Sequence, residues 1–381
     1  MDLYEYQGKQ LFGRFGIPVS EGRLATSPEE ARAAAVDLGG PVVVKAQVLT
    51  GARGKAGGVK LAEGPVDAEQ KAREILGLDI RGHVVRKLWI ERASTIAKEY
   101  YLSITFDRSE KKPLFILTKE GGVEIEEVAA NTPDALARLH VNVLEGYQPY
   151  QARRLIYAAA IDDPNEQKQL LAIIGKLYRC FVDSDAMLCE INPLIVTPGG
   201  EVKALDSKFT VDDSALYRHP DIAEMRDVSA ADPLEALARE KGVTYVKLDG
   251  SVGILGNGAG LSMSTVDVVV VAGGTPANFC DLGGGGDAQG VVDALSVITR
   301  DPGVRSIFFN IFGGITRGDE VARGILAALD QMKLELPIVV RLDGTNAEEG
   351  RRLLAEAAKG NLYVEPTMLD AARRAVELAA A

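Results

Sequence analysis

Apolar residues follow two different patterns in the two parts of the chain. Up to about residue 235, strand-like apolar runs such as "PVVVKAQV" and "EYYLSITF" mix with longer amphipathic stretches in no repeating order. After Gly242 the apolar runs "SVGILG", "ANFCDL", "RSIFFNIF", "PIVVRL" and "LYV" alternate with stretches of helical pattern. This alternation is typical of βαβ units and predicts a parallel, doubly wound sheet in the second part.

Two long helices are predicted in the first part, over "PYQARRLIYAAAI" and "PNEQKQLLAIIGKLYRCFV". Pro164 stands at a position that suits the first turn of the second of these helices. The polar segment "RDVSAADPLEALAREKG" separates the two parts and is the best candidate for a linker. At 381 residues the chain is too long for one typical core. We therefore predict an α/β protein of two domains, residues 1–235 and 236–381.

Glycines and small polar residues gather directly after the strands predicted in the second domain. They form the loops "GNGAG", "GGGGD", "FGGITRGD" and "DGTN". In an open α/β sheet such loops share one edge, where ligands bind. Each loop also opens a predicted helix, so backbone N–H groups and the positive end of the helix dipole face that edge. A single loop would be explained by a tight turn, but four together predict an anion-binding edge.

Composition excludes several classes of protein. With 46% hydrophobic and 25% charged residues, the chain is ordinary for a soluble globular protein. The net charge of -11 argues against nucleic acid as the main partner. The longest apolar run, "VDVVVVAGG", is far too short for a membrane span, and the N-terminus resembles no targeting signal. Cys180, Cys189 and Cys280 lack metal-like spacing, so we expect reduced thiols in a cytoplasmic protein without membrane association.

A basic, glycine-rich loop follows the strand that ends near Lys45. The segment "VVVKAQVLTGARGKAGGVKL" places Gly51, Arg53, Gly54 and Lys55 between two predicted strands. Such a loop can close N–H groups and cations over a polyphosphate. It is not a Walker loop, because no GK[ST] follows at the required spacing. Taken alone, the loop is equally compatible with a plain surface turn.

Two glutamates flank a short connection in "LWIERASTIAKEYYLSITF". In a nucleotide site, Glu91 and Glu99 could hold a ribose or an adenine amino group by hydrogen bonds. Without further context, two ordinary surface glutamates are the simpler interpretation.

The predicted hairpin "DAMLCEINPLIVTPGGEVKALDSKFTVDD" collects polar side chains on one face. Glu190 and Asn192 are two residues apart and therefore point the same way. If the hairpin loop has an odd number of residues, Asn192 lies opposite Asp206, and Glu190 lies opposite Lys208. Asn192 and Asp206 supply hard oxygen ligands that suit Mg²⁺, whose shell phosphates and waters complete. A solvated polar face is the alternative, although the apolar opposite face would anchor the hairpin against a core.

Taken in order, several long segments resemble one family. The segments "KAQVLTGARGKAGG", "ERASTIAKEYYL", "CEINPLIV", "GNGAGLSMST" and "NIFGGITR" are similar to those of the beta subunit of succinate–CoA ligase (succinyl-CoA synthetase), ADP-forming type. The resemblance runs from "YEYQGKQLF" to the last predicted helix. It implies an α+β ATP-grasp domain followed by a flavodoxin-like CoA-ligase domain. The activity it implies is the reversible conversion of succinate, CoA and ATP to succinyl-CoA, ADP and phosphate in the citric acid (tricarboxylic acid) cycle.

The resemblance also implies roles for particular residues. It implies that the nucleotide, ATP/ADP with GTP/GDP also possible, is bound by Lys45, Ala52, Arg53, Gly54, Glu91, Ser94 and Glu99. The Mg²⁺ ligands that it implies are Asn192 and Asp206, and Glu190 falls where the family holds a phosphohistidine. Ala52 departs from the glycine expected there, and alanine resists positive φ.

The same resemblance implies that the second domain contains a substrate and phosphate site, which is formed by Asn257, Gly314, Ile315 and Thr316. The implied reaction passes through a histidine that carries the phosphoryl group. His83, His140 and His219 lie in none of the motifs. We therefore expect an alpha subunit to supply the phosphohistidine and most of the CoA site, while succinate is the small-molecule substrate.

Three alternatives remain open from the sequence. A sister acyl-CoA ligase such as malate–CoA ligase would share every motif quoted above. A nicotinamide dehydrogenase could be inferred from "GNGAGL", but Leu261 stands where the third glycine belongs. A non-catalytic nucleotide- or CoA-binding protein is the third alternative. It is disfavoured because the candidate metal ligands, the acidic residues and the phosphate loop are all present in one chain.

Overall fold

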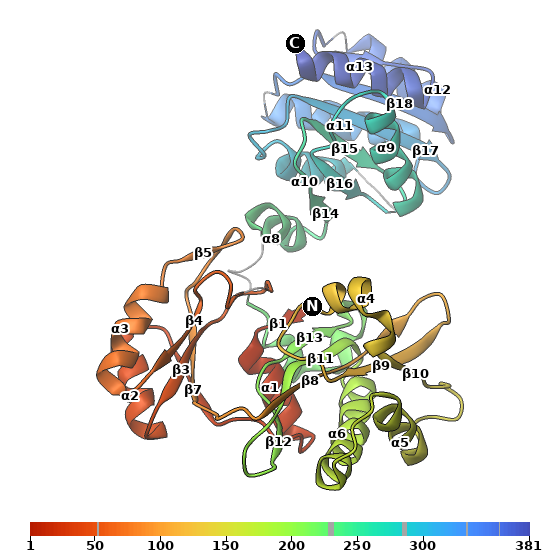
Figure 1. Cartoon of the computed structure of the whole chain (residues 1–381). Helices are drawn as coiled ribbons and strands as arrows, with labels where there is room; N and C mark the ends of the chain where they lie inside the picture. Colours follow the sequence, from red (N-terminus) through yellow and green to blue (C-terminus); the bar gives the residue numbers. More distant parts are fainter. Residues whose placement is uncertain (52, 228–231, 284–287, 333, 358) are drawn as a thin grey trace. The chain divides into compact units, whose positions relative to one another are not determined.

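The computed structural model describes residues 1–51, 53–227, 232–283, 288–332, 334–357 and 359–381 (Figure 1). The chain forms two compact units, residues 1–230 and 231–381. The predicted boundary at 235/236 falls inside helix α8 (Pro233–Glu240), so this part of the predicted linker is helical. Asp232 caps α8 by accepting from the N–H groups of Leu234 and Glu235, and Pro233 stands in the first turn. The rest of the predicted linker includes residues 228–231, which lie outside the described residues.

A small antiparallel sheet in the first unit has the order β2-β7-β3-β4 and packs against two helices. Its elements are β2 (Gly22–Ala25), α2 (Pro28–Leu38), β3 (Val42–Ala46), β4 (Val59–Ala62), α3 (Pro65–Ile75) and β7 (Leu88–Arg92), with a short hairpin of β5 (Asp79–Ile80) and β6 (His83–Val84) beside them. Val42, Val44 and Ala46 join the core under the helices. Because strand side chains alternate, Lys45 lies on the opposite face.

A larger antiparallel sheet in the same unit has the order β1-β13-β11-β8-β9-β10, with β12 paired to β11. Its strands are β1 (Asp2–Leu3), β8 (Lys98–Asp107), β9 (Lys112–Thr118), β10 (Ala137–His140), β11 (Ala186–Val196), β12 (Val202–Ala204) and β13 (Lys208–Val211). The helices of this part are α1 (Glu5–Arg14), α4 (Ile125–Asn131), η1 (Pro133–Ala135), α5 (Pro149–Ala158), α6 (Pro164–Asp183), η2 (Asp213–Arg218) and α7 (Pro220–Ala223).

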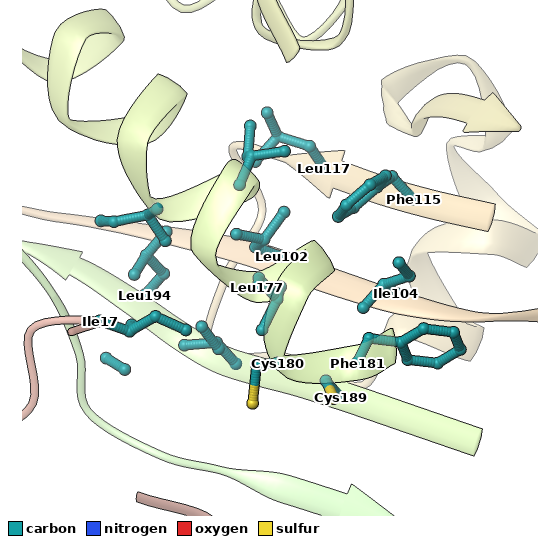
Figure 2. Close-up of a cluster of buried hydrophobic side chains, with 14 of the residues drawn as sticks. Ile17, Leu102, Ile104, Phe115, Leu117, Leu177, Cys180, Phe181, Cys189 and Leu194 are labelled. Atoms are coloured by element: carbon teal, nitrogen blue, oxygen red, sulfur yellow. The ribbon is translucent and has the colours of Figure 1, made fainter. Parts of the chain in front are cut away.

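The core of this part lies between α6 and the larger sheet. Figure 2 shows Leu177 and Phe181 of α6 against Leu102 and Ile104 of β8 and Leu194 of β11. All five side chains are 2% exposed or less. At about 25 cal/mol per Å² of apolar surface removed from water, burial of this kind stabilises the fold by about 1.5–3 kcal/mol per large side chain. The helices therefore hold one face of the sheet rigidly.

The hairpin register predicted from the sequence is confirmed in its regular parts. Glu190 pairs with Lys208, and Leu194 pairs with Ala204. The second arm is broken into β12 and β13, however, and Asp206 lies in the break between them. Asn192 and Asp206 therefore lie between the two paired stretches and are not themselves paired in a continuous ladder.

The second unit contains a six-stranded sheet in the order β14-β16-β15-β17-β18-β19. Its strands are β14 (Thr244–Lys247), β15 (Val252–Gly256), β16 (Asn278–Asp281), β17 (Ser306–Gly313), β18 (Ile338–Gly344) and β19 (Leu362–Val364). In chain order, the five parallel strands run 2-1-3-4-5, which is the flavodoxin-like order. This confirms the predicted doubly wound sheet, to which β14 adds an antiparallel edge strand that was not predicted.

Helices cover both faces of this sheet. Phe308 packs with α9 (Ala259–Val271) and α13 (Met368–Ala380), whereas the next residue, Phe309, packs in the core that α10 (Ala288–Ile298), α11 (Gly318–Met332) and α12 (Ala347–Glu356) share. The alternation of adjacent buried phenylalanines is what a strand covered on both sides requires. Throughout the described part of the chain, no helix has the length and apolar character that crossing a bilayer would need.

Candidate functional site

Glu190 lies on β11 of the larger sheet, on the face opposite the core residue Cys189. Its Oε2 accepts a hydrogen bond of 2.9 Å from the hydroxyl of Tyr101 on β8. Burial raises the pKa of Glu190, while the Tyr101 hydrogen bond and the Lys208 ammonium lower it in part. The strand framework thus holds one carboxyl group in a fixed position with a pKa above its ordinary value.

Asn192 is held by the loop that follows β9. Its Oδ1 accepts from the N–H of Gly122 at 2.8 Å, and its Nδ2 donates to the carbonyl of Val123 at 2.8 Å. These two bonds explain the orientation of the side chain without a metal, but the amide oxygen retains a second lone pair.

Asp206 lies in the break between β12 and β13 and binds the predicted phosphate loop. Its Oδ1 and Oδ2 accept from Arg53 Nη2 at 2.7 and 2.9 Å, and Oδ1 also accepts from the Ser207 N–H at 2.7 Å. Within the described ranges, no group of three or more histidine, cysteine or acidic side chains could hold a metal. The oxygen pair of Asn192 and Asp206 fits only an ion that phosphates and waters also coordinate, as Mg²⁺ commonly is.

Lys45 lies at the centre of a buried charge cluster. Its Nζ donates to Glu5 Oε1 at 2.9 Å, to Glu91 Oε1 at 3.1 Å and to the Leu205 carbonyl at 2.8 Å. The charge cluster as a whole comprises Glu5, Lys9, Lys45, Arg53, Glu91 and Asp206. Burial alone would raise the pKa of Glu5, but Lys45, Lys9 and Arg53 hold it well below its usual value.

The two glutamates of the predicted nucleotide site lie in different surroundings. Glu91 is fully buried in the charge cluster, where its Oε2 accepts from Trp89 Nε1 at 2.9 Å. Glu99 is half-buried at the start of β8 and lines a hollow of about 470 Å³. The hollow is completed by Lys98, Tyr100, Lys119, Ala160, Ile161, Asp162, Asp163 and Glu166.

The remaining residues of the predicted nucleotide site lie in connecting segments. Ser94 follows β7, and its Oγ lies 3.3 Å from Ser20 Oγ. The carbonyl of Gly54 accepts from the N–H of Gly57 at 3.1 Å, which closes a turn in the loop between β3 and β4. Ala52 lies outside the described residues, so the predicted effect of alanine there stays a prediction.

In the second unit, the predicted substrate residues meet where the strand order reverses. Asn257 follows β15, and Gly314–Thr316 follow the adjacent strand β17. Asn257 Nδ2 donates to the Phe312 carbonyl at 2.8 Å, and the Phe312 N–H donates to Asn257 Oδ1 at 2.9 Å. The reversal point of a doubly wound sheet is where ligands bind in this fold class. The structure therefore brings these predicted residues together.

Side chains of the protein already occupy part of the predicted anion-binding edge. Asp281 Oδ1 accepts from the N–H groups of Gly258 at 2.5 Å and Gly283 at 2.8 Å. At α11, a hydrogen bond from Asn346 and then the Arg317 guanidinium lower the pKa of Asp319 to about 2. One N–H donor of the loop before α9 is thus already bound within the chain, and most of the predicted loop "GGGGD" lies outside the described residues, so the anion-binding edge stays a prediction.

At the same edge, the hydroxyl group of Thr316 is buried without a hydrogen-bond partner in the described part of the chain. Thr316 is 3% exposed, and its Oγ1 has no hydrogen-bond partner among the described residues. Buried hydroxyl groups normally have a partner. Ile315 beside it is 88% exposed. The turn after β17 therefore combines an accessible backbone with an unsatisfied donor.

The three histidines lie apart from the predicted site residues. His140 pairs with Asp107 at 2.8 Å, and His219 pairs with Asp185 at 2.6 Å. His83 belongs to the β5–β6 hairpin. The expectation that the reacting histidine comes from another chain stays a prediction.

Both units of the chain match known protein families. The ATP-grasp domain family matches residues 2–196, and the CoA-ligase family matches residues 255–375. A protein of Rubrobacter xylanophilus named succinate–CoA ligase (ADP-forming) subunit beta is 61% identical over 379 residues, covering 100% of this chain and 99% of that protein. The chain belongs to the succinate–CoA ligase beta-subunit family.

Other members of the succinate–CoA ligase family carry two related names. A Chloroflexus aurantiacus protein named as the ADP-forming beta subunit is 51% identical, covering 100% of this chain and 99% of that protein. A Thermus thermophilus protein named as the GDP-forming beta subunit is 47% identical, covering 99% of both chains. An ATP citrate lyase of Methanothrix soehngenii has the same fold, with a TM-score of 0.77, 21% identity and 99% coverage of both chains.

Three residues around the candidate site were not identified from the sequence. Glu5 and Lys9 are spaced like an ordinary exposed helical ion pair, so their burial has no sequence signal. Tyr101 could have been found, because it stands two residues after Glu99 and therefore shares its strand face.

Proposed function

We propose that the chain is the beta subunit of a cytoplasmic succinate–CoA ligase. With an alpha subunit that carries a phosphohistidine, it would interconvert succinate, CoA and ATP with succinyl-CoA, ADP and phosphate, a step of the tricarboxylic acid cycle. The observation that carries this proposal is the ion pair in which Arg53 Nη2 contacts both carboxylate oxygens of Asp206. It joins the predicted phosphate loop to the hairpin of Glu190, in a chain 61% identical over its length to a protein of that name.

The first unit would bind the nucleotide and direct its terminal phosphate. Lys45 and Arg53 supply cations for the phosphates, and Asn192 and Asp206 supply oxygen ligands for Mg²⁺. When bound, Mg²⁺ neutralises charge that develops on the transferred phosphoryl group. Glu190 would accept a hydrogen bond from the partner's histidine and so orient the ring toward the phosphate. By the same family resemblance, the nucleotide site would also include Ala52, Gly54, Glu91, Ser94 and Glu99.

The second unit would hold the acyl substrate. Asn257 and the turn Gly314–Thr316 offer amide, hydroxyl and backbone N–H donors at the reversal point of the sheet. Donors of this kind suit the carboxylate of succinate or a phosphoryl group. A cytoplasmic location is supported by Cys180, Cys189 and Cys280, which are buried free thiols.

Co-expression with the alpha subunit, followed by a coupled assay, tests the function. We expect CoA consumption that depends on succinate and on ATP or GTP together with Mg²⁺. Malate used in preference to succinate would make the protein a malate–CoA ligase beta subunit instead. Family members bear both ADP-forming and GDP-forming names, so both nucleotides should be compared.

Replacing Tyr101 by phenylalanine should move the acid limb of the pH–rate profile to higher pH. The change removes the hydrogen bond that lowers the pKa of Glu190, so the carboxyl group should lose its proton at higher pH. One hydrogen bond of about 1 kcal/mol corresponds to a shift of about 0.7 pH units. Tyr100 is the matched control, since its hydroxyl binds Glu166 at 2.6 Å. Tyr100→Phe should leave the limb in place; equal shifts in both variants would contradict the role of Tyr101.

A further inference from the structure

Two members of the charge cluster lie on α1, outside the motifs assigned to nucleotide binding. Glu5 and Lys9 are one helical turn apart and are 3% and 2% exposed. Lysine and glutamate are almost never this buried unless they are paired. Lys9 Nζ donates to Glu5 Oε1 at 2.7 Å and also binds Glu91.

Glu5 contacts both cations proposed to bind the nucleotide phosphates. Its Oε1 accepts from Lys45 at 2.9 Å, and its Oε2 accepts from Arg53 at 2.5 Å. Oε2 also accepts from Gln47 Nε2 at 3.3 Å. A single carboxylate therefore fixes the positions of an ammonium on β3 and a guanidinium on the loop that follows it.

Helix α1 is itself held close to the segment that carries Asp206. A Cβ atom added at Gly8 would lie 2.2 Å from Ser207 Oγ, so only glycine permits this approach. Phe12 of the same helix packs against Phe209 of β13, with ring centroids 5.8 Å apart. The larger sheet thus anchors α1, while Glu5 and Lys9 reach Lys45 and Glu91 of the smaller sheet.

The cluster is electrically balanced. Glu5, Glu91 and Asp206 oppose Lys9, Lys45 and Arg53, three charges against three. Removing one partner of a buried pair leaves an uncompensated charge, which costs more than the pair itself contributes. The placement of Lys45 and Arg53 therefore depends on both α1 residues.

We propose that Glu5 and Lys9 are positioning residues of the nucleotide-phosphate site. Glu5 aims Lys45 and Arg53 at the phosphates, and Lys9 holds Glu91 and offsets the Glu5 charge. This assignment rests on the proposed nucleotide site. The alternative is that the two residues only secure α1 to the rest of the unit.

Calorimetric titration of the full chain with ADP and Mg²⁺ tests the positioning role. Glu5→Gln should weaken ADP binding by about tenfold, since glutamine carries no negative charge and its NH₂ group cannot accept from the second cation. In a Lys45→Met background, the same change should weaken binding by less than threefold, because a residue that acts through Lys45 has little further effect once Lys45 is gone. Lys9→Met keeps the Glu5 contacts to Lys45 and Arg53 and should weaken ADP binding about threefold. This variant replaces Glu5→Gln in the titration if Glu5→Gln does not fold.

Asp301→Asn is the matched control, because Asp301 is a buried carboxylate of the second unit paired with Lys247 at 2.8 Å. It should leave ADP affinity unchanged. In the complex with the alpha subunit, Glu5→Gln should raise KM for ATP and leave KM for succinate unchanged. If the wild-type chain does not bind ADP, the proposed nucleotide site is wrong. If the wild-type chain binds ADP, then equal affinity in Glu5→Gln, or fully additive losses in the double variant, would overturn the positioning role alone.

Discussion

Turnover is expected to fall by about 10²–10³-fold when Asp206 is replaced by asparagine, since catalysis of phosphoryl transfer is largely charge neutralisation in a fixed geometry. The variant loses the negative charge of one of two proposed Mg²⁺ ligands and the ionic partner of Arg53. Asp206 is 33% exposed, and asparagine can still accept from the Ser207 N–H, so the melting temperature should change little. Steady-state assays over a range of Mg²⁺ concentrations should show partial recovery as Mg²⁺ is raised.

Asp185 provides a closely matched control for this experiment. Its carboxylate forms a two-point pair with Arg218, with both distances 2.6 Å, but it touches none of the proposed site residues. Asp185→Asn should keep the wild-type rate and Mg²⁺ dependence. A wild-type rate in Asp206→Asn at low Mg²⁺ would show that Asp206 is not a metal ligand.

The second large effect concerns phosphorylation in trans. When the complex is incubated with γ-labelled ATP and Mg²⁺, acid-labile label should appear on the alpha subunit, and none should appear on this chain without its partner. Glu190→Gln should slow the labelling by about 10²-fold, the lower range for losing a positioned acid–base group. Stable label on His83, His140 or His219 would contradict the proposal.

The free energy of unfolding of Glu190→Gln shows whether slower labelling results from the lost carboxylate or from loss of the fold. Burial makes the pKa of Glu190 higher in the folded protein than in the unfolded chain. Such a carboxyl group costs stability at any pH above both pKa values, and the cost is relieved as the pH falls through the folded pKa. Glutamine carries no charge, so at pH 7 the free energy of unfolding of the variant should equal or exceed that of wild type. Urea unfolding measures it; a clear loss of stability would make the kinetic result uninterpretable as a local effect.

Much of the second unit was predictable because its strands are continuous apolar runs followed by glycine loops. Strands covered by helices on both faces have this pattern. Strand β14 escaped prediction because only Tyr245 of its four residues is buried. Helix α8 was taken for part of a linker because the whole segment is polar and bears Asp and Pro, although Asp232 and Pro233 are typical of a helix start.

The candidate site was predictable only where residues are neighbours in the chain or across a hairpin. Alternation placed Glu190 and Asn192 on one face, and the register placed Lys208 opposite Glu190. The Arg53–Asp206 pair joins residues 153 positions apart. Glu5 reaches Lys45 and Arg53 only because α1 lies against both sheets. Such contacts depend on packing between elements, which the pattern of a single segment does not contain.

The balance of charges in the cluster restricts how this site can change during evolution. Each of its six members has its charge cancelled by neighbours that come from α1, β3, β7 and the loops beside them. A single neutral substitution at any member other than the partly exposed Asp206 leaves a buried net charge, a cost of about 3–5 kcal/mol when one partner of a buried pair is lost. Neutralising one acidic member and one basic member together restores a net charge of zero in the cluster. Mutations at these positions should therefore become fixed in compensating pairs, and an intermediate sequence with only one of the two would be selected against.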